Sequence, residues 1–98
     1  MTQTLKFRTA NKFPGYHWRT VELSNGQHID IIKDDEFGGD YILELRYEDE
    51  DYHRSYRRIT DFCKYRAAKA YAEDFAAYLL GDAPQPKIFA DKYIDLDC

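Results

Sequence analysis

Two runs of carboxylates, at 34–36 and 48–51, are the most chemically distinctive stretches of the sequence. Acidic oxygens ligate Ca²⁺, but a calcium loop needs alternating oxygen ligands, a glycine at a fixed place and a closing glutamate. Neither run has this arrangement, so we expect no bound metal and no other cofactor. The runs indicate either well-solvated loops or a surface that attracts a basic partner.

Nine of the ten charged residues between positions 34 and 51 are acidic. We expect these carboxylates in two loops at opposite ends of one strand, about 20–25 Å apart. Carboxylates spread in this way can imitate backbone phosphates and occupy the cationic channel of a nucleic-acid-binding partner. The predicted partner-binding residues are Asp34, Asp35, Glu36, Phe37, Asp40, Glu48, Asp49, Glu50 and Asp51.

Residues that act as nucleophiles in enzymes are present without the settings that such chemistry needs. Ser24 is expected in a turn and Ser55 in a strand, and neither lies at a nucleophile elbow. Cys63 is expected in the first turn of a helix, where the helix dipole lowers a thiol pKa, but no sequence signature of a cysteine nucleophile surrounds it. The three histidines lack the spacing of metal ligands. We therefore predict a protein that is not an enzyme.

A second surface combines basic and aromatic side chains in the stretch 52–69. Cationic side chains neutralise phosphates and aromatic rings stack on bases, so this mixture is typical of a nucleic-acid-binding patch. The alternative is internal neutralisation. With a turn at 49–51, Glu44 lies opposite Tyr56 and diagonal to both Arg54 and Arg58, and such opposite charges stabilise a sheet. We favour this alternative. The residues of the predicted nucleic-acid-binding patch are Trp18, Arg54, Tyr56, Arg57, Arg58, Lys64 and Arg66.

Alternation of apolar and polar residues predicts a short edge strand at 4–8 and four further strands at 16–23, 27–33, 41–48 and 52–59. A three-residue loop with Gly26 in the left-handed conformation pairs Leu23 with Gln27 and Val21 with Ile29, which gathers the apolar residues on one face. The polar face of this hairpin is then formed by Trp18, Thr20, Glu22, His28 and Asp30.

A stripe of small and aromatic residues predicts one long helix, capped by Thr60 and Asp61 and ending near Leu80. Gly81 suits a left-handed position after the helix, and two prolines follow it. We expect a single domain over residues 1–83 and an acidic tail over 84–98, in which residues 92–94 form a short strand or stay loose.

This order of elements predicts an α+β fold, β-β-β-β-α: an antiparallel sheet of three to four strands with one long amphipathic helix on one face. From Trp18 through Ala77, the layout resembles AP2-type and integrase arm-binding DNA modules, which implies a small nucleic-acid-binding domain. The acidic stretch 34–51 departs from that pattern because it repels DNA. The uncovered sheet face around Trp18, His28 and Ile42 is a third candidate surface, for dimerisation.

Small size, acidity, tyrosine content and a lone α+β domain resemble small phage-encoded inhibitors of bacterial defence, among them anti-CRISPR proteins. The chain has 98 residues, nine tyrosines and a net charge of −4. The resemblance implies a non-catalytic DNA mimic whose acidic loops occupy the nucleic-acid-binding surface of a host defence complex. The implied partner is a basic nucleic-acid-binding protein, with direct binding of nucleic acid as the alternative.

The sequence contains no apolar run approaching the ~20 residues of a membrane span, so we expect no membrane partner. Two cysteines, Cys63 and Cys98, form neither a disulfide framework nor a closely spaced metal pair. We therefore expect reduced thiols and a cytoplasmic protein, in the host cytoplasm if it is phage-encoded. Either a monomer or a dimer is compatible with the sequence.

Overall fold

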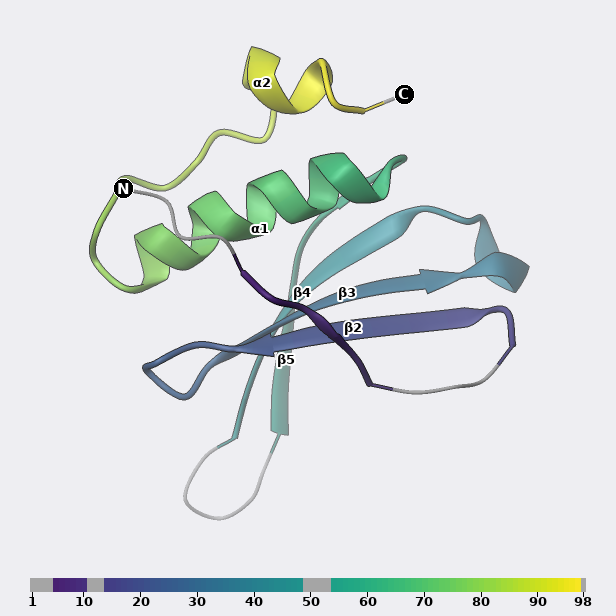
Figure 1. Cartoon of the computed structure of the whole chain (residues 1–98), viewed down its shortest axis with the longest axis horizontal. Coiled ribbons are helices and arrows are strands. Elements are labelled where there is room, and N and C mark those ends of the chain that lie inside the picture. Colours follow the sequence, from purple (N-terminus) through teal and green to yellow (C-terminus); the bar gives the residue numbers. More distant parts are fainter. Residues whose placement is uncertain (1–4, 11–13, 49–53, 98) are drawn as a thin grey trace.

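The computed structural model describes residues 5–10, 14–48 and 54–97, and they form an antiparallel sheet covered on one face by a helix (Figure 1). The α+β architecture is as predicted, with five strands in place of three to four. Strands follow chain order across the sheet: β1 (Arg8–Thr9), β2 (Tyr16–Glu22), β3 (His28–Asp34), β4 (Tyr41–Glu48) and β5 (Arg54–Phe62). The helices are η1 (Asp35–Phe37, 3-10), α1 (Tyr65–Leu79) and α2 (Asp91–Ile94).

The β2–β3 hairpin has the predicted loop and register. Val21 pairs with Ile29, and the Leu23 N–H donates to the Gln27 carbonyl at 2.8 Å. Gly26 has a φ of 87°, a left-handed conformation that glycine adopts without steric strain. The turn therefore fixes which side chains of β2 and β3 face α1 and which face away from it.

The core lies between the sheet and α1, and the helix contributes alanines where it approaches the strands. Ile29 and Leu43 are completely buried at 0% exposure, and Ala67, Ala68 and Ala72 on α1 are equally buried. Small side chains on the helix leave room for the branched residues of β3 and β4 to pack closely. This packing covers one face of the sheet and leaves the other without a helix.

Strand β5 runs further than predicted, and this corrects the expected start of the helix. Phe62 is buried and pairs with Tyr41, so Thr60 and Asp61 belong to the strand and do not cap α1. Lys64 is the N-cap residue instead, without a side-chain hydrogen bond. The β4–β5 pairing also contains a bulge, because Leu43 pairs with Thr60 whereas Glu44 pairs with Arg58.

Helix α1 ends as predicted, but the following tail differs from the prediction. Gly81, with a φ of 81°, donates its N–H to the Tyr78 carbonyl, and Asp82 donates to Ala77, which is the Schellman arrangement. Residues 91–94 form a helical turn, α2, and not the expected strand. Tyr93 is 1% exposed and its ring lies 5.0 Å from that of Tyr71, so the tail completes the core on the far side of α1 (Figure 1).

Cys63 lies before α1 and is disulfide-bonded, which corrects two expectations from the sequence. The residue is not in the first turn of the helix, and its thiol is not reduced. The one other cysteine of the sequence, Cys98, lies outside the described residues. Disulfides persist in oxidising compartments and are rare in the cytosol.

Candidate binding site on the helix-free sheet face

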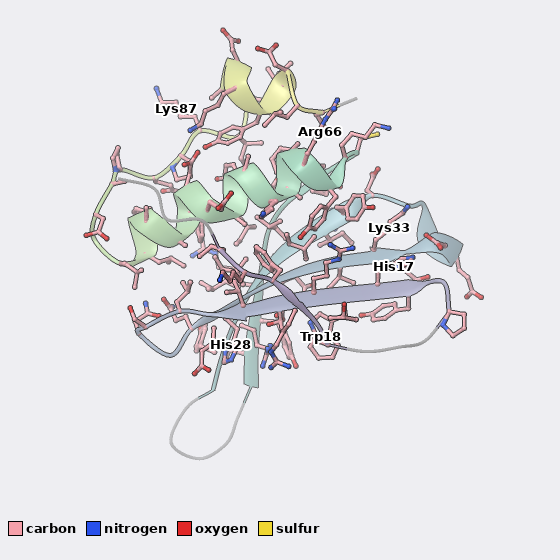
Figure 2. All side chains as sticks on the ribbon, in the orientation of Figure 1. His17, Trp18, His28, Lys33, Arg66 and Lys87 are labelled. Carbon is pink, nitrogen blue, oxygen red and sulfur yellow. The ribbon has the colours of Figure 1, made fainter. Side chains whose placement is uncertain are left out.

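The sheet face opposite α1 carries polar and aromatic side chains from four neighbouring strands. Cross-strand pairing places Trp18 beside Ile32 and Asp30 beside Glu44. On β5, Tyr56 lies beside Arg46 of β4. Trp18 and His28 project from the side of the sheet away from α1 (Figure 2). The predicted polar face of the first hairpin is therefore the starting point of a larger surface, which continues across β4 and β5.

A buried ion pair forms the centre of this face. Arg46 Nε donates to Asp30 Oδ2 at 2.9 Å, and Arg46 Nη2 donates to Thr20 Oγ1 at 3.2 Å. Thr20 and Asp30 are each 1% exposed, and Arg46 is 8% exposed. Because a buried charge is strongly destabilising without a partner, this network fixes the relative positions of β2, β3 and β4.

Next to this ion pair lies a groove of about 340 Å³. We call it the aromatic–acidic groove. Its walls combine rings with carboxylates, a mixture that attracts organic cations through the ring faces and through charge. The groove is lined by Tyr16, Trp18, Asp30, Ile32, Glu44 and Tyr56.

Glu44 is the carboxylate of the groove that the protein leaves without an ion pair among its described residues. Burial and the neighbouring charge of Asp30 raise the pKa of Glu44, and Arg58 lowers it to a smaller extent. The pKa of the Tyr16 hydroxyl is also raised, by burial and then by Glu44, Asp34 and Asp30. Burial is the main cause of both shifts, and the neighbouring carboxylates at this end of the face add to it.

Two buried nitrogens of this face make no hydrogen bond within the described part of the chain: Trp18 Nε1 and His28 Nδ1. The Trp18 ring also lies 5.8 Å from the guanidinium of Arg46, a cation–π contact. Because Nε1 is buried and is a donor only, the part of Trp18 that suits a cation is the face of its ring.

The predicted acidic partner surface is only partly free in the structure. Asp34 accepts a hydrogen bond from the Glu36 N–H at 3.0 Å and so caps η1. Asp35 lies 3.6 Å from Lys33 Nζ and 3.3 Å from His17 Nε2. Glu36 and Asp40 are exposed. Thus two of these four carboxylates already have roles within the molecule.

The remaining members of that surface are placed by their backbone or lie outside the described residues. Phe37 ends η1 and Glu48 ends β4. Asp49, Glu50 and Asp51 are outside the described residues, so the second acidic loop stays a prediction.

The structure does not bring the predicted nucleic-acid-binding residues into one patch. Arg57 pairs with Leu45 and Arg58 with Glu44, which places the two arginines on opposite faces of β5. Arg58 also donates to Asp61 at 3.0 Å. Arg54 begins β5. The expected pairing of Glu44 with Tyr56 is wrong: Glu48 pairs with Arg54, so the register differs by two residues from that of a turn at 49–51, and Tyr56 pairs with Arg46.

The two basic residues of this set near α1 contact the C-terminal tail. Arg66 Nε donates to the Leu96 carbonyl at 2.6 Å, and the backbone N–H of Lys64 donates to Asp97 Oδ1 at 2.9 Å. Trp18 and Tyr56 do come together, but they do so in the aromatic–acidic groove, beside carboxylates. Carboxylates repel phosphates, so this arrangement suits a cation better than a nucleic acid.

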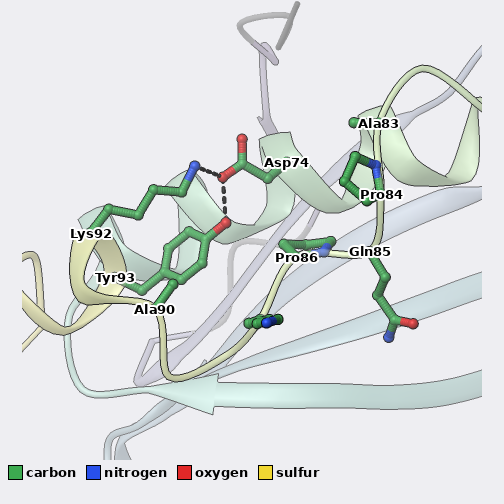
Figure 3. A pocket seen from close by; sticks show the side chains of 9 residues that line it. Asp74, Ala83, Pro84, Gln85, Pro86, Ala90, Lys92 and Tyr93 are labelled. Carbon is green, nitrogen blue, oxygen red and sulfur yellow. Dashed lines mark hydrogen bonds and ion pairs between the residues drawn. The ribbon is translucent and has the colours of Figure 1, made fainter.

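A larger cavity, of about 410 Å³, lies where the tail crosses α1 (Figure 3). At its wall Asp74 binds both the Lys92 ammonium and the Tyr93 hydroxyl. Prolines 84 and 86 form part of its wall. These contacts hold the tail in place, and we do not assign this cavity to a ligand.

Comparison with known proteins gives no relative: no protein-family model, curated protein or solved structure matches this chain. Within the described residues, no group of three or more histidine, cysteine or acidic side chains is arranged to hold a metal ion. No helix in the described part of the chain is long and apolar enough to cross a membrane.

Sequence reasoning missed the groove, although one signal for it was present. Asp30 interrupts the apolar run of β3 and Arg46 interrupts that of β4. Opposite charges in the middle of two neighbouring strands predict a buried pair, because isolated charges there would be strongly destabilising.

Proposed function

We propose that this protein is a non-catalytic binding domain that engages a basic protein partner through the helix-free face of its sheet. The observation that supports this function is the aromatic–acidic groove, in which Glu44 has no ion pair among the described residues. A cation from a partner would supply the charge that Glu44 lacks, and the rings of Trp18 and Tyr56 would contact it.

The acidic residues after β3 extend this surface. Asp34 pairs with Tyr16, which lines the groove, and the exposed carboxylates of Glu36 and Asp40 follow in the chain. Such an arrangement accelerates the approach of a basic partner through long-range attraction. One form of this function is the inhibition of a nucleic-acid-binding complex of host defence, in which carboxylates take the place of phosphates.

The first experiment uses Trp18, the one tryptophan of the chain, as a reporter within the groove. Its fluorescence is followed while the protein is titrated with a lysine–glycine repeat peptide, with a glutamate–glycine repeat peptide of equal length as the control. We expect the fluorescence to change with the basic peptide and not with the acidic one, and the change to become smaller as salt is added. No response to the basic peptide at low salt would contradict the proposed function.

A second titration, with random duplex DNA, separates a protein partner from a nucleic acid. We expect no binding to DNA, since the exposed arginines do not form one patch. Salt-sensitive DNA binding that is lost in the double variant R57E/R58E would replace the proposal with direct nucleic-acid recognition.

A further inference from the structure

We infer that the aromatic–acidic groove receives a single arginine side chain of the partner and selects it over lysine. This inference rests on the proposed function and names the chemical group that the site recognises. The groove lies on the helix-free face, with Glu44 as its acceptor and Tyr16, Trp18 and Tyr56 as its rings.

The size of the groove supports one extended side chain as the occupant. A volume of about 340 Å³ lies at the lower limit of ligand sites, which span roughly 300–1,000 Å³. Its lining residues come from β2, β3, β4 and β5 within one sheet face, so the floor is a sheet and not a channel between helices. A helix of the partner would need a longer trough than these six residues form.

The chemistry of the walls favours a guanidinium over an ammonium. A guanidinium is planar, is weakly hydrated and stacks on aromatic faces, and its parallel N–H groups match the two oxygens of a carboxylate. An ammonium is compact and strongly hydrated, so it loses more on leaving water. The protein itself places a guanidinium on a tyrosine elsewhere, since Arg19 lies 4.4 Å from the centre of the Tyr65 ring.

The buried ion pair prepares the groove for this ligand. Asp30 lines the groove, but both of its carboxylate oxygens accept bonds from Arg46, at 2.9 and 3.4 Å. The acceptor left for an incoming cation is therefore Glu44, which lies opposite Asp30 on β4. A fixed floor with one open acceptor reduces the ordering that binding requires.

The charged and titratable groups around Glu44 make the binding depend on pH. They are Tyr16 from β2, Asp30 from β3, Arg46 on β4 itself, and Tyr56 and Arg58 from β5. Arginine binding requires the ionised form of Glu44. Affinity should therefore fall as the pH is lowered through the pKa of this group, which lies above its ordinary value.

The test compares the lysine–glycine repeat peptide with the same peptide in which the central lysine is replaced by arginine, so that charge and length are equal. Trp18 fluorescence measures both affinities. We expect the arginine peptide to bind about tenfold more tightly, equivalent to ~1.4 kcal/mol. In Glu44→Gln this preference should disappear, whereas in Glu36→Gln, which removes an exposed charge outside the groove, it should remain.

A second pair of variants tests the aromatic wall. Tyr56→Leu removes an exposed ring of the groove, and Tyr78→Leu removes an exposed ring of α1. We expect only Tyr56→Leu to reduce the preference for arginine, and the far-ultraviolet circular dichroism of both variants to match that of the parent protein.

The outcomes separate the two proposals. Equal binding of both peptides would overturn the arginine site and leave general attraction to a basic partner. The same conclusion would follow if Glu44→Gln and Glu36→Gln reduced the preference for arginine equally. Absence of binding by either peptide would overturn the proposed function itself.

Discussion

Asp30 and Glu44 lie directly opposite each other on β3 and β4, so two carboxylates are direct neighbours on the sheet face. Arg46 neutralises Asp30, whereas Glu44 has no ion pair among the described residues. Burial and the charge of Asp30 therefore raise the pKa of Glu44. The fold keeps a carboxylate where its own stability would favour a neutral side chain, which is typical of binding sites.

Glu44→Gln should therefore stabilise the protein near neutral pH. Because the pKa of Glu44 is higher in the folded than in the unfolded protein, its contribution to stability is greatest below the unfolded pKa and is lost as the pH rises through the folded value. The gain in unfolding temperature should shrink as the pH approaches about 4, where the Glu44 carboxyl is largely neutral in both the folded and the unfolded protein. Thermal unfolding followed by circular dichroism at several pH values measures it.

Glu36→Gln is the matched control for this prediction, since Glu36 is exposed and does not line the groove. A similar stabilisation by both variants would indicate reduced overall negative charge and not a local effect at Glu44.

Arg46→Met should destabilise the protein strongly, by about 3–5 kcal/mol, because it leaves Asp30 buried without its cation. The double variant Asp30→Val/Arg46→Met replaces both charges with apolar groups and should recover much of this loss. Urea unfolding of the two variants provides the comparison. A double variant as unstable as the single one would show that the guanidinium stabilises the fold through its other contacts.

Tyr93→Ala should lower the free energy of unfolding by about 3–5 kcal/mol, since the ring is completely buried against Tyr71 and Phe62. Phe89 provides the control within the tail: it is 86% exposed, and Phe89→Ala should change stability by no more than about 0.5 kcal/mol. Equal, small effects of both substitutions would mean that the tail is not part of the cooperative fold.

Reduction of the disulfide at Cys63 should destabilise the protein by about 2–4 kcal/mol, because the cross-link restricts the unfolded chain. Chemical unfolding with and without dithiothreitol measures this difference. In Cys63→Ser the reductant should have no effect, and thiol labelling of the unreduced parent protein should find no reactive thiol at Cys63. A labelled Cys63 before reduction would contradict the disulfide.

The local pattern of the sequence was sufficient to predict the first hairpin and the end of α1. The apolar face formed by Val21 and Ile29 is compatible with one loop length, and Gly26 allows the backbone conformation that this loop needs. Gly81 has the same role after the helix. These features depend on neighbours in the chain, so a single sequence contains them.

The features that the sequence did not reveal depend on residues distant in the chain. Thr60 and Asp61 have good capping side chains, but burial of Phe62 against the core extends β5 through them. Likewise, the aromatic residue Tyr93 docks on α1, so its segment is a helical turn and not a strand. Tertiary packing overrides local preference at both places.

The groove combines these two kinds of information. Trp18 and Asp30 were placed on one face from the hairpin register, whereas Glu44 joined them through the β3–β4 pairing and Tyr56 through the β4–β5 pairing. These two pairings join strands across longer connections, whose register is not apparent from alternation alone. The site was therefore half accessible from the sequence, and the missing half depended on the pairing of strands that no tight turn aligns.

The bulge in the β4–β5 ladder determines where β5 tolerates the deletion of one residue. Ile59 is the residue of β5 that the ladder skips, since Leu43 pairs with Thr60 and Glu44 with Arg58. Deleting Ile59 would give a regular ladder and leave Phe62 on the α1 side and Tyr56 in the groove. If the bulge is kept, deleting any residue from 55 to 57 would instead move the residues of β5 that precede the deletion to the opposite face of the sheet. Homologues one residue shorter at this point would thus retain both the core and the groove.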